Sequence, residues 1–217
     1  MDFLIFLPVL LMSVVAHEVA HAQVAKWEGD ETAYRLGRIT LNPLPHLDLM
    51  GSLIVPLLHF FLPVPFLFGW ARPVPVNPRN FRDPRWSDIR VSLAGITANL
   101  ILAVACFLLL ALALTLGTRV SGAGGVLDVL VAVAYFGLYL NLILAFFNLI
   151  PIPPLDGSHV LYHLLPPELG ARYQEVGRYG IGILMVAVFV FPGALGVILF
   201  PVEFLMTTAE RALQLWL

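Results

Sequence analysis

Two histidines and a glutamate near the N-terminus have a spacing that suits metal-dependent hydrolysis. They occur in the run His17-Glu18-Val19-Ala20-His21, the pattern HExxH. On a helix, residues four apart share a face, so both imidazoles can bind one metal ion while Glu18 accepts a proton from a water molecule held there. The alternative interpretation is a helix with two packing histidines and a glutamate that reaches the surface. The apolar flanks disfavour it, because an unpaired carboxylate inside a membrane is costly.

Asp156 is the best candidate for a third ligand. A catalytic zinc ion usually has three protein ligands and one open position. No further histidine follows His21 closely, and Glu28 is disfavoured because the helix is expected to end near Gly29. Local sequence alone leaves an equal alternative, in which Asp156 caps a helix that begins at Gly157.

A rival metal set is formed by Asp156, His159 and His163, which have the helical spacing i, i+3, i+7. This set lacks a neighbouring general base, so we consider it the weaker hypothesis.

Several further polar residues lie in apolar segments. Asn141 is expected to be a hydrogen-bond partner between helices, which is the usual role of asparagine in a membrane. Asn99 and Asn148 have the same alternative, but either could instead donate to a substrate carbonyl or a developing oxyanion. His46 and His59 are expected to be packing or interfacial residues.

The composition predicts a membrane protein. Of 217 residues, 59% are hydrophobic and only 12% are charged, about half the charged fraction of a soluble domain, and disordered chains are likewise far more polar. The net charge of −2 gives no basic field for nucleic acid. The single cysteine, Cys106, excludes an intrachain disulfide and a cysteine-based zinc site. We therefore expect one all-α polytopic domain over residues 1–217, a bundle of about four to six transmembrane segments.

Four main spans are expected, at residues 2–25, 92–115, 126–149 and 179–200, followed by a C-terminal helix over 202–217. The first segment has no basic start and no cleavage site, so it is interpreted as a retained span. Between the first and second spans, residues 35–75 are expected to form a small membrane-associated β or re-entrant region. Within it a short strand is predicted over 37–43, and three prolines in 50–71 disfavour a straight helix.

The basic residues predict the orientation. If 50–71 does not cross, residues 26–90 and 150–178 share one face and carry ten of the 12 lysines and arginines. Basic loops favour the cytoplasm, so we expect the N-terminus outside and the active site on the cytoplasmic side of the cell membrane, within the bilayer. The same topology returns Asp156 to the face where the first span ends.

The two motifs together resemble the site-2 protease family, the intramembrane zinc metalloproteases of peptidase family M50. HExxH in a first span is followed by a later motif, residues 148–157, that reads Asn-Leu-Ile-Pro-Ile-Pro-Pro-Leu-Asp-Gly. The resemblance extends through residues 37–48, 69–78 and 94–99. It implies that His17, His21 and Asp156 bind one Zn²⁺, that Glu18 is the general base and that Asn99 helps to hold substrate.

The resemblance also implies a function and partners. The expected activity is hydrolysis of peptide bonds within or near transmembrane segments, as regulated intramembrane proteolysis of single-span membrane proteins. The chain has no room for the PDZ or CBS domains of some members, so regulation is expected from a membrane partner, from self-association or from the lipid bilayer. The alternatives are a divalent metal transporter and a catalytically inactive membrane scaffold.

Overall fold

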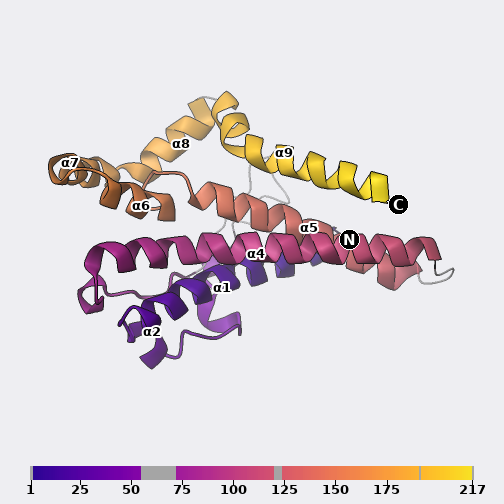
Figure 1. Cartoon of the computed structure of the whole chain (residues 1–217), viewed down its shortest axis with the longest axis horizontal. Helices are drawn as coiled ribbons and strands as arrows, with labels where there is room; N and C mark the ends of the chain where they lie inside the picture. Colours follow the sequence, from indigo (N-terminus) through magenta and orange to yellow (C-terminus); the bar gives the residue numbers. More distant parts are fainter. Residues whose placement is uncertain (1, 55–71, 120–123, 191, 217) are drawn as a thin grey trace.

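The computed structural model describes residues 2–54, 72–119, 124–190 and 192–216, and over these residues it is helical without strands (Figure 1). The all-α prediction is confirmed for this part of the chain. The α-helices are α1 (Asp2–Trp27), α2 (Thr32–Arg35), α4 (Pro84–Arg119), α5 (Gly124–Asn148), α6 (Asp156–Leu164), α7 (Pro167–Gly177), α8 (Gly180–Val190) and α9 (Pro192–Trp216). Three short turns are η1 (Leu44–His46), η2 (Leu49–Ile54) and η3 (Pro78–Asn80).

Three of the described helices are long and apolar enough to cross a membrane, at Phe3–Trp27, Pro84–Gly117 and Gly125–Asn148. They correspond to the first three expected spans. In Figure 1, α4 and α5 run side by side along the long axis, and α1 lies against both of them. The helices α6 and α7 gather at the end where α1 stops and α4 begins.

Helix α4 begins eight residues before the expected span because its first turn is capped. The Asp83 carboxylate Oδ1 accepts hydrogen bonds from the backbone N–H groups of Arg85 and Trp86, both at 3.0 Å. Pro84 supplies a first helical residue that needs no hydrogen-bond partner for its nitrogen. The extra turns carry Asp88 into the same helix as Asn99.

Glu28 fastens the end of α1 to the first turns of α4. Its carboxylate accepts a hydrogen bond from Ser87 Oγ at 2.7 Å and pairs with Arg90 Nη1 at 2.9 Å. The hydrogen bond from Ser87, assisted by Arg90, lowers the pKa of Glu28, so this link is made by a charged carboxylate. It fixes how far α1 slides along α4.

A second carboxylate, Asp30, organises the loops beside this link. It is fully buried and accepts hydrogen bonds from Asn77 N at 2.7 Å, from Asn80 Nδ2 at 2.8 Å and from Thr32. Burial alone would raise the pKa of Asp30, but these bonds lower it below its ordinary value. The loop after α1 and the segment before α4 are therefore held as one unit.

The described apolar core lies between α4, α5 and α9, with α9 returning along α5 (Figure 1). Small residues such as Ala103 and Ala134 let the helices approach closely, as in other membrane bundles. The buried members of this core are Ala103, Leu110, Ala134, Leu138, Leu142, Val202, Met206 and Leu213.

The predicted strand over residues 37–43 is wrong. These residues form turns and irregular backbone that leads into η1, with no ladder partner among the described residues. The polar side chains make local contacts here. Thr40 Oγ1 accepts a hydrogen bond from Asn42 N, and Asn42 Oδ1 accepts one from Leu44 N. The expected re-entrant stretch at 55–71, with His59, lies outside the described residues.

The expected fourth span, 179–200, is covered by two described helices, since α8 ends at Val190 and α9 begins at Pro192. Proline suits the first position of a helix, where its nitrogen needs no hydrogen-bond partner. The C-terminal helix expected over 202–217 is the continuation of α9, and α7 was not foreseen.

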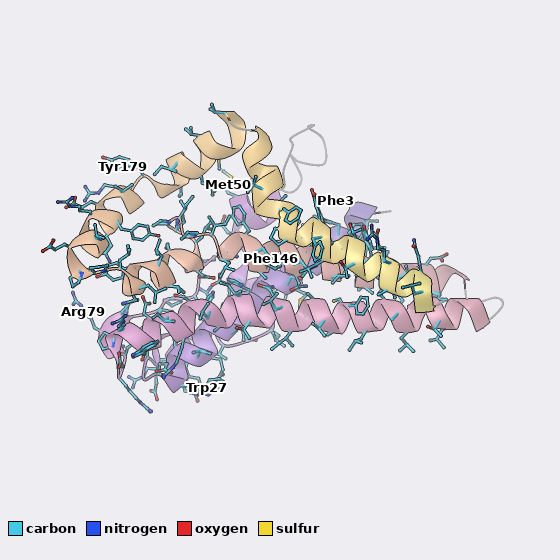
Figure 2. All side chains as sticks on the ribbon, turned by 45° about the horizontal axis from the view of Figure 1, so that its top comes forward. Phe3, Trp27, Met50, Arg79, Phe146 and Tyr179 are labelled. Atoms are coloured by element: carbon cyan, nitrogen blue, oxygen red, sulfur yellow. The ribbon has the colours of Figure 1, made fainter. Side chains whose placement is uncertain are left out.

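Polar groups gather at one end of the bundle. Figure 2 shows Trp27, Arg79 and Tyr179 toward the end opposite Phe3. The end of α1, the start of α4 and the segment after α5 thus lie together, as the expected topology requires.

Candidate metal centre

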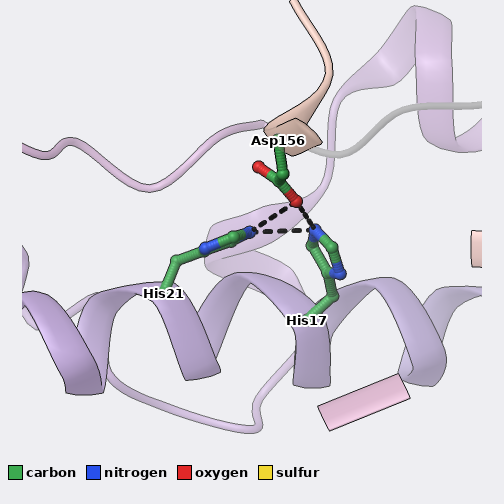
Figure 3. A group of neighbouring side chains, drawn as sticks. All are labelled: His17, His21 and Asp156. Carbon is green, nitrogen blue, oxygen red and sulfur yellow. Dashed lines mark hydrogen bonds and ion pairs between the residues drawn. The ribbon is translucent and has the colours of Figure 1, made fainter. Parts of the chain in front are cut away.

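Three predicted ligands from distant parts of the chain meet at one point. His17 and His21 lie one turn apart on α1, and Asp156 is the first residue of α6 (Figure 3). Asp156 Oδ2 lies 3.1 Å from His17 Nε2 and 3.3 Å from His21 Nε2, and the two Nε2 atoms are 2.9 Å apart. Among the described residues this is the one group of three or more that is arranged to share a metal ion.

A chain of amide groups fixes the tautomer that neutral His17 adopts. Asn99 Nδ2 faces the carbonyl oxygens of Ser13 at 3.3 Å and of the Asn141 side chain at 2.8 Å, and Asn141 Nδ2 in turn faces the carbonyl of Gly137 at 2.8 Å. Carbonyls only accept, so the Asn99 oxygen must be the atom that lies 2.6 Å from His17 Nδ1. His17 Nδ1 therefore donates, and its Nε2 carries a lone pair.

His21 has the same arrangement with a backbone partner. Its Nδ1 lies 2.7 Å from the carbonyl oxygen of Val91, so Nδ1 donates and Nε2 is again the lone-pair nitrogen. Two lone pairs and the Asp156 carboxylate thus point at one another. Asp156 Oδ2 is buried and has no hydrogen-bond donor.

This donor set fits a divalent transition metal. Buried acceptors that face each other without a donor repel unless a cation lies between them. Two imidazole nitrogens and one carboxylate oxygen are the ligands of several catalytic zinc sites, and each histidine is oriented through its other nitrogen as metal-binding histidines usually are.

Two glycines give the ligands their room. A Cβ on Gly95 of α4 would lie 2.5 Å from both His17 Cε1 and His21 Nε2, which is far inside contact distance. A Cβ on Gly157 would lie 2.2 Å from the carbonyl oxygen of Leu149. The first glycine lets α4 close over the rings, and the second lets the segment after α5 fold back so that Asp156 faces them.

Glu18 lies beside the ligands and is held by the loop before α4. Its Oε2 accepts a hydrogen bond from the backbone N–H of Val74 at 2.8 Å. Val74 is buried and belongs to the irregular segment 72–77. A half-buried carboxylate with one oxygen anchored and the other not bonded by any described donor has the arrangement that a general base needs.

The three asparagines considered in the sequence analysis make different contacts. Asn141 is confirmed as a partner between helices, since its Nδ2 donates to Ser13 Oγ on α1 at 2.9 Å. Asn99 is fully buried, and its amide contacts His17, the Ser13 carbonyl and Asn141, so it too is a partner between helices. Asn148 donates to the Leu144 carbonyl of its own helix at 2.9 Å, and no described contact joins it to the centre.

The remaining histidines lie elsewhere. His46 is buried, as expected of a packing residue, with Nε2 3.0 Å from the Thr40 carbonyl. The rival set is not assembled, because His159 and His163 contact Asp88 on α4 and not Asp156. Asp88 is a residue that the sequence did not single out. The available signal was the spacing of His159 and His163, which are four residues apart and can meet one partner.

Comparison with known proteins finds a peptidase family and relatives named as zinc metalloproteases. The profile described as peptidase family M50 matches residues 123–190. The chain is 41% identical over 186 residues to "Putative zinc metalloprotease YwhC" of Bacillus subtilis, covering 84% of this chain and 78% of that protein. It is 33% identical over 188 residues to "Putative zinc metalloprotease Rip2" of Mycolicibacterium smegmatis, covering 85% of this chain and 66% of the relative.

A further relative, "Putative zinc metalloprotease Rip2" of Mycobacterium tuberculosis, is 34% identical over 180 residues, 63% of its length. The chain thus spans somewhat less than two thirds of the two mycobacterial relatives. No solved structure matches it. A relative above 40% identity over most of both chains, a family profile and a site that suits a metal agree. The chain therefore belongs to peptidase family M50.

Proposed function

We propose that this chain is an intramembrane zinc metalloprotease that hydrolyses peptide bonds within or near the transmembrane segments of single-span membrane proteins. Membership of a peptidase family, relatives whose names include zinc metalloprotease, and three helices able to cross a membrane support this activity. The single observation that carries it is the convergence of three acceptors, His17 Nε2, His21 Nε2 and Asp156 Oδ2, without a donor.

These three atoms are proposed to hold one Zn²⁺. When bound, zinc supplies Lewis acidity, which acidifies water toward neutral pH and polarises a carbonyl group. The protein's contribution is to present its lone pairs in advance. Asn99 and the Val91 carbonyl hold both Nδ1–H groups, so neither histidine has to change tautomer before it binds a cation.

Glu18 is proposed as the general base. It is the residue next to His17, and the Val74 N–H fixes one of its oxygens at 2.8 Å. The other oxygen takes a proton from the attacking water and then passes it to the nitrogen of the leaving amine. The anchored geometry keeps the carboxylate beside the ligands during both transfers.

The depth of the centre supports cleavage inside the bilayer. His17 lies 15 residues after the start of α1, about 22 Å along the helix at 1.5 Å per residue. In a hydrocarbon core of about 30 Å, this depth supports a position of the ligands below the membrane surface on the side where α1 ends. The arginine-rich loops gather on that side, so we propose that it faces the cytoplasm and that the N-terminus lies outside the cell membrane.

A transmembrane helix buries its carbonyls in its own hydrogen bonds, so we propose that a substrate must unwind before attack. Segments that unwind easily are therefore the expected targets, and regulation acts on access to them.

The test is a pair of substitutions with two readouts. We expect Glu18→Gln to retain one zinc per chain and to lower cleavage of a single-span reporter by at least a thousandfold, because the ligands remain while the base is lost. Asp156→Ala should lower both the zinc content and the cleavage of the reporter. Metal analysis of purified protein and gel-based cleavage in detergent or vesicles measure these. Retained cleavage by Glu18→Gln would reject the base, and zinc transport into vesicles without cleavage would favour a transporter.

A further inference from the structure

A second histidine pair meets an aspartate close to the metal centre. On α6, His159 Nδ1 lies 3.1 Å and His163 Nε2 lies 2.8 Å from the same oxygen, Oδ2 of Asp88 on α4. Asp88 and His163 are largely buried, with 14% and 15% of their side chains exposed, and His159 is half exposed. These three residues, here called the α4–α6 clamp, help to line a cavity of about 410 Å³.

The clamp is a hydrogen-bonded ion pair and not a second metal centre. The described residues contain one group arranged to share an ion, and the clamp is not it. A carboxylate oxygen can accept from two N–H donors, and such charge-assisted bonds are stronger than neutral ones. The hydrogen bond to Asp88 outweighs burial and raises the pKa of His159, which favours the charged donor.

The clamp lies on the helix that carries Asp156. Helix α6 is only nine residues long, and Asp156 is its first residue. His159 and His163 follow at i+3 and i+7, which places them on the same face, within two turns of the ligand. Whatever holds these two histidines therefore sets the position and rotation of Asp156.

The clamp also completes a pattern along α4. Counting from Asp88, the positions i+3, i+7 and i+11 are Val91, Gly95 and Asn99, which share one face of the helix. The Val91 carbonyl holds His21, Gly95 gives both rings their space, and Asn99 holds His17. Two ligands are thus oriented by this face of α4 directly. Asp88 extends the same face to the third ligand through His159 and His163.

We propose that Asp88 is a positioning residue, which through His159 and His163 aligns α6 so that Asp156 meets the two histidine ligands held by the same face of α4. The inference rests on the proposed metalloprotease function. It assigns to a residue outside the metal centre the alignment of one ligand with the other two.

Zinc affinity of the purified full chain is the direct test, measured by competition with a chromogenic chelator. Asp88→Ala should weaken zinc binding 10- to 100-fold, the usual effect of losing a group that orients a ligand. Cleavage of the reporter should return at saturating zinc with KM unchanged. Arg85→Ala removes a charge three residues away on the same helix, from an exposed side chain that lies over the Trp86 ring, and should leave zinc affinity within twofold of wild type.

A second pair keeps the test valid if Asp88→Ala fails to fold. His163→Gln retains an N–H donor for Asp88 and should keep most of the affinity, whereas His163→Leu should lose it to the extent that Asp88→Ala does. Equal zinc affinity in wild type, Asp88→Ala and His163→Leu would overturn the proposal, as would an equal loss in Arg85→Ala. If wild type binds no zinc, or His17→Ala binds it as tightly, the metalloprotease function itself fails.

Discussion

The metal centre and the α4–α6 clamp use the same residue types at the same spacing and reach opposite chemistry. Each has two histidines four residues apart on one helix and an aspartate from another element. In the metal centre the Nδ1 atoms are occupied by Asn99 and by the Val91 carbonyl, so both Nε2 atoms present lone pairs. In the clamp the rings turn donors toward the carboxylate. In the metal centre the acceptors at Nδ1 thus leave the Nε2 lone pairs free for a cation, whereas the clamp joins its rings to the carboxylate as an ion pair.

The two sites also differ in their exposure to solvent. The metal ligands His17 and His21 are buried against α4, whereas His159 of the clamp is half exposed and lines a cavity. A charged imidazole tolerates the second environment better than the first. The clamp can therefore exist without a metal.

Filling the space that Gly95 leaves beside His17 and His21 is expected to have the largest effect on zinc affinity. Gly95→Ala would put a methyl group 2.5 Å from both rings, so α4 must move away and zinc affinity should fall by more than a hundredfold. The clamp should survive, because Asp88 lies two turns away. Chelator competition measures the affinity, and Gly182→Ala, whose Cβ meets nothing within 4 Å, is the control. Normal zinc binding in Gly95→Ala would show that the two regions are not held by one face of α4.

Removing the acceptor of His17 tests the tautomer argument. Asn99→Leu leaves His17 Nδ1 without its oxygen, so the ring is no longer fixed as an Nε2 ligand and zinc affinity should fall 10- to 100-fold. Thr97→Val changes an exposed polar residue of the same helix and should have no such effect. A loss of folding without a loss of affinity in the folded fraction would contradict the orienting role of Asn99.

The smallest expected effect is a titration in the clamp. Asp88 holds the pKa of His159 above its ordinary value of 6.5, so this contact stabilises the fold fully below pH 6.5 and is lost as pH rises through the raised pKa. NMR titration of the His159 ring should show that raised pKa in wild type and a return toward 6.5 in Asp88→Asn. The same pKa in both proteins would mean that the clamp carries no charge.

The sequence predicted the three long helices because each is a mostly apolar segment more than 20 residues long, which makes the signal strong. The sequence did not predict the features that depend on polar contacts. The first turns of α4 are rich in arginine and were interpreted as loop, although Asp83 caps them. The strand over 37–43 was predicted from β-branched residues and a turn, but no second strand pairs with it among the described residues.

The convergence of His17, His21 and Asp156 was predicted, because HExxH fixes two positions on one helix and a topology with three crossings returns Asp156 to the same end. The contacts of Asn99 and Asp88 were not predicted, since each depends on which side chain of another helix it meets. The pattern along one chain carries no information on that pairing. The sequence therefore left Asn99 open between a partner on another helix and a donor to substrate.

The centre also has a consequence for how the protein is made. Asp156 lies 135 residues after His21, and it follows the third long helix. A growing chain that has inserted only α1 holds the histidine pair and Glu18 but neither the carboxylate nor the supporting face of α4. A centre of the proposed kind is therefore complete only late in synthesis, once the third long helix and the first residue of α6 have been made.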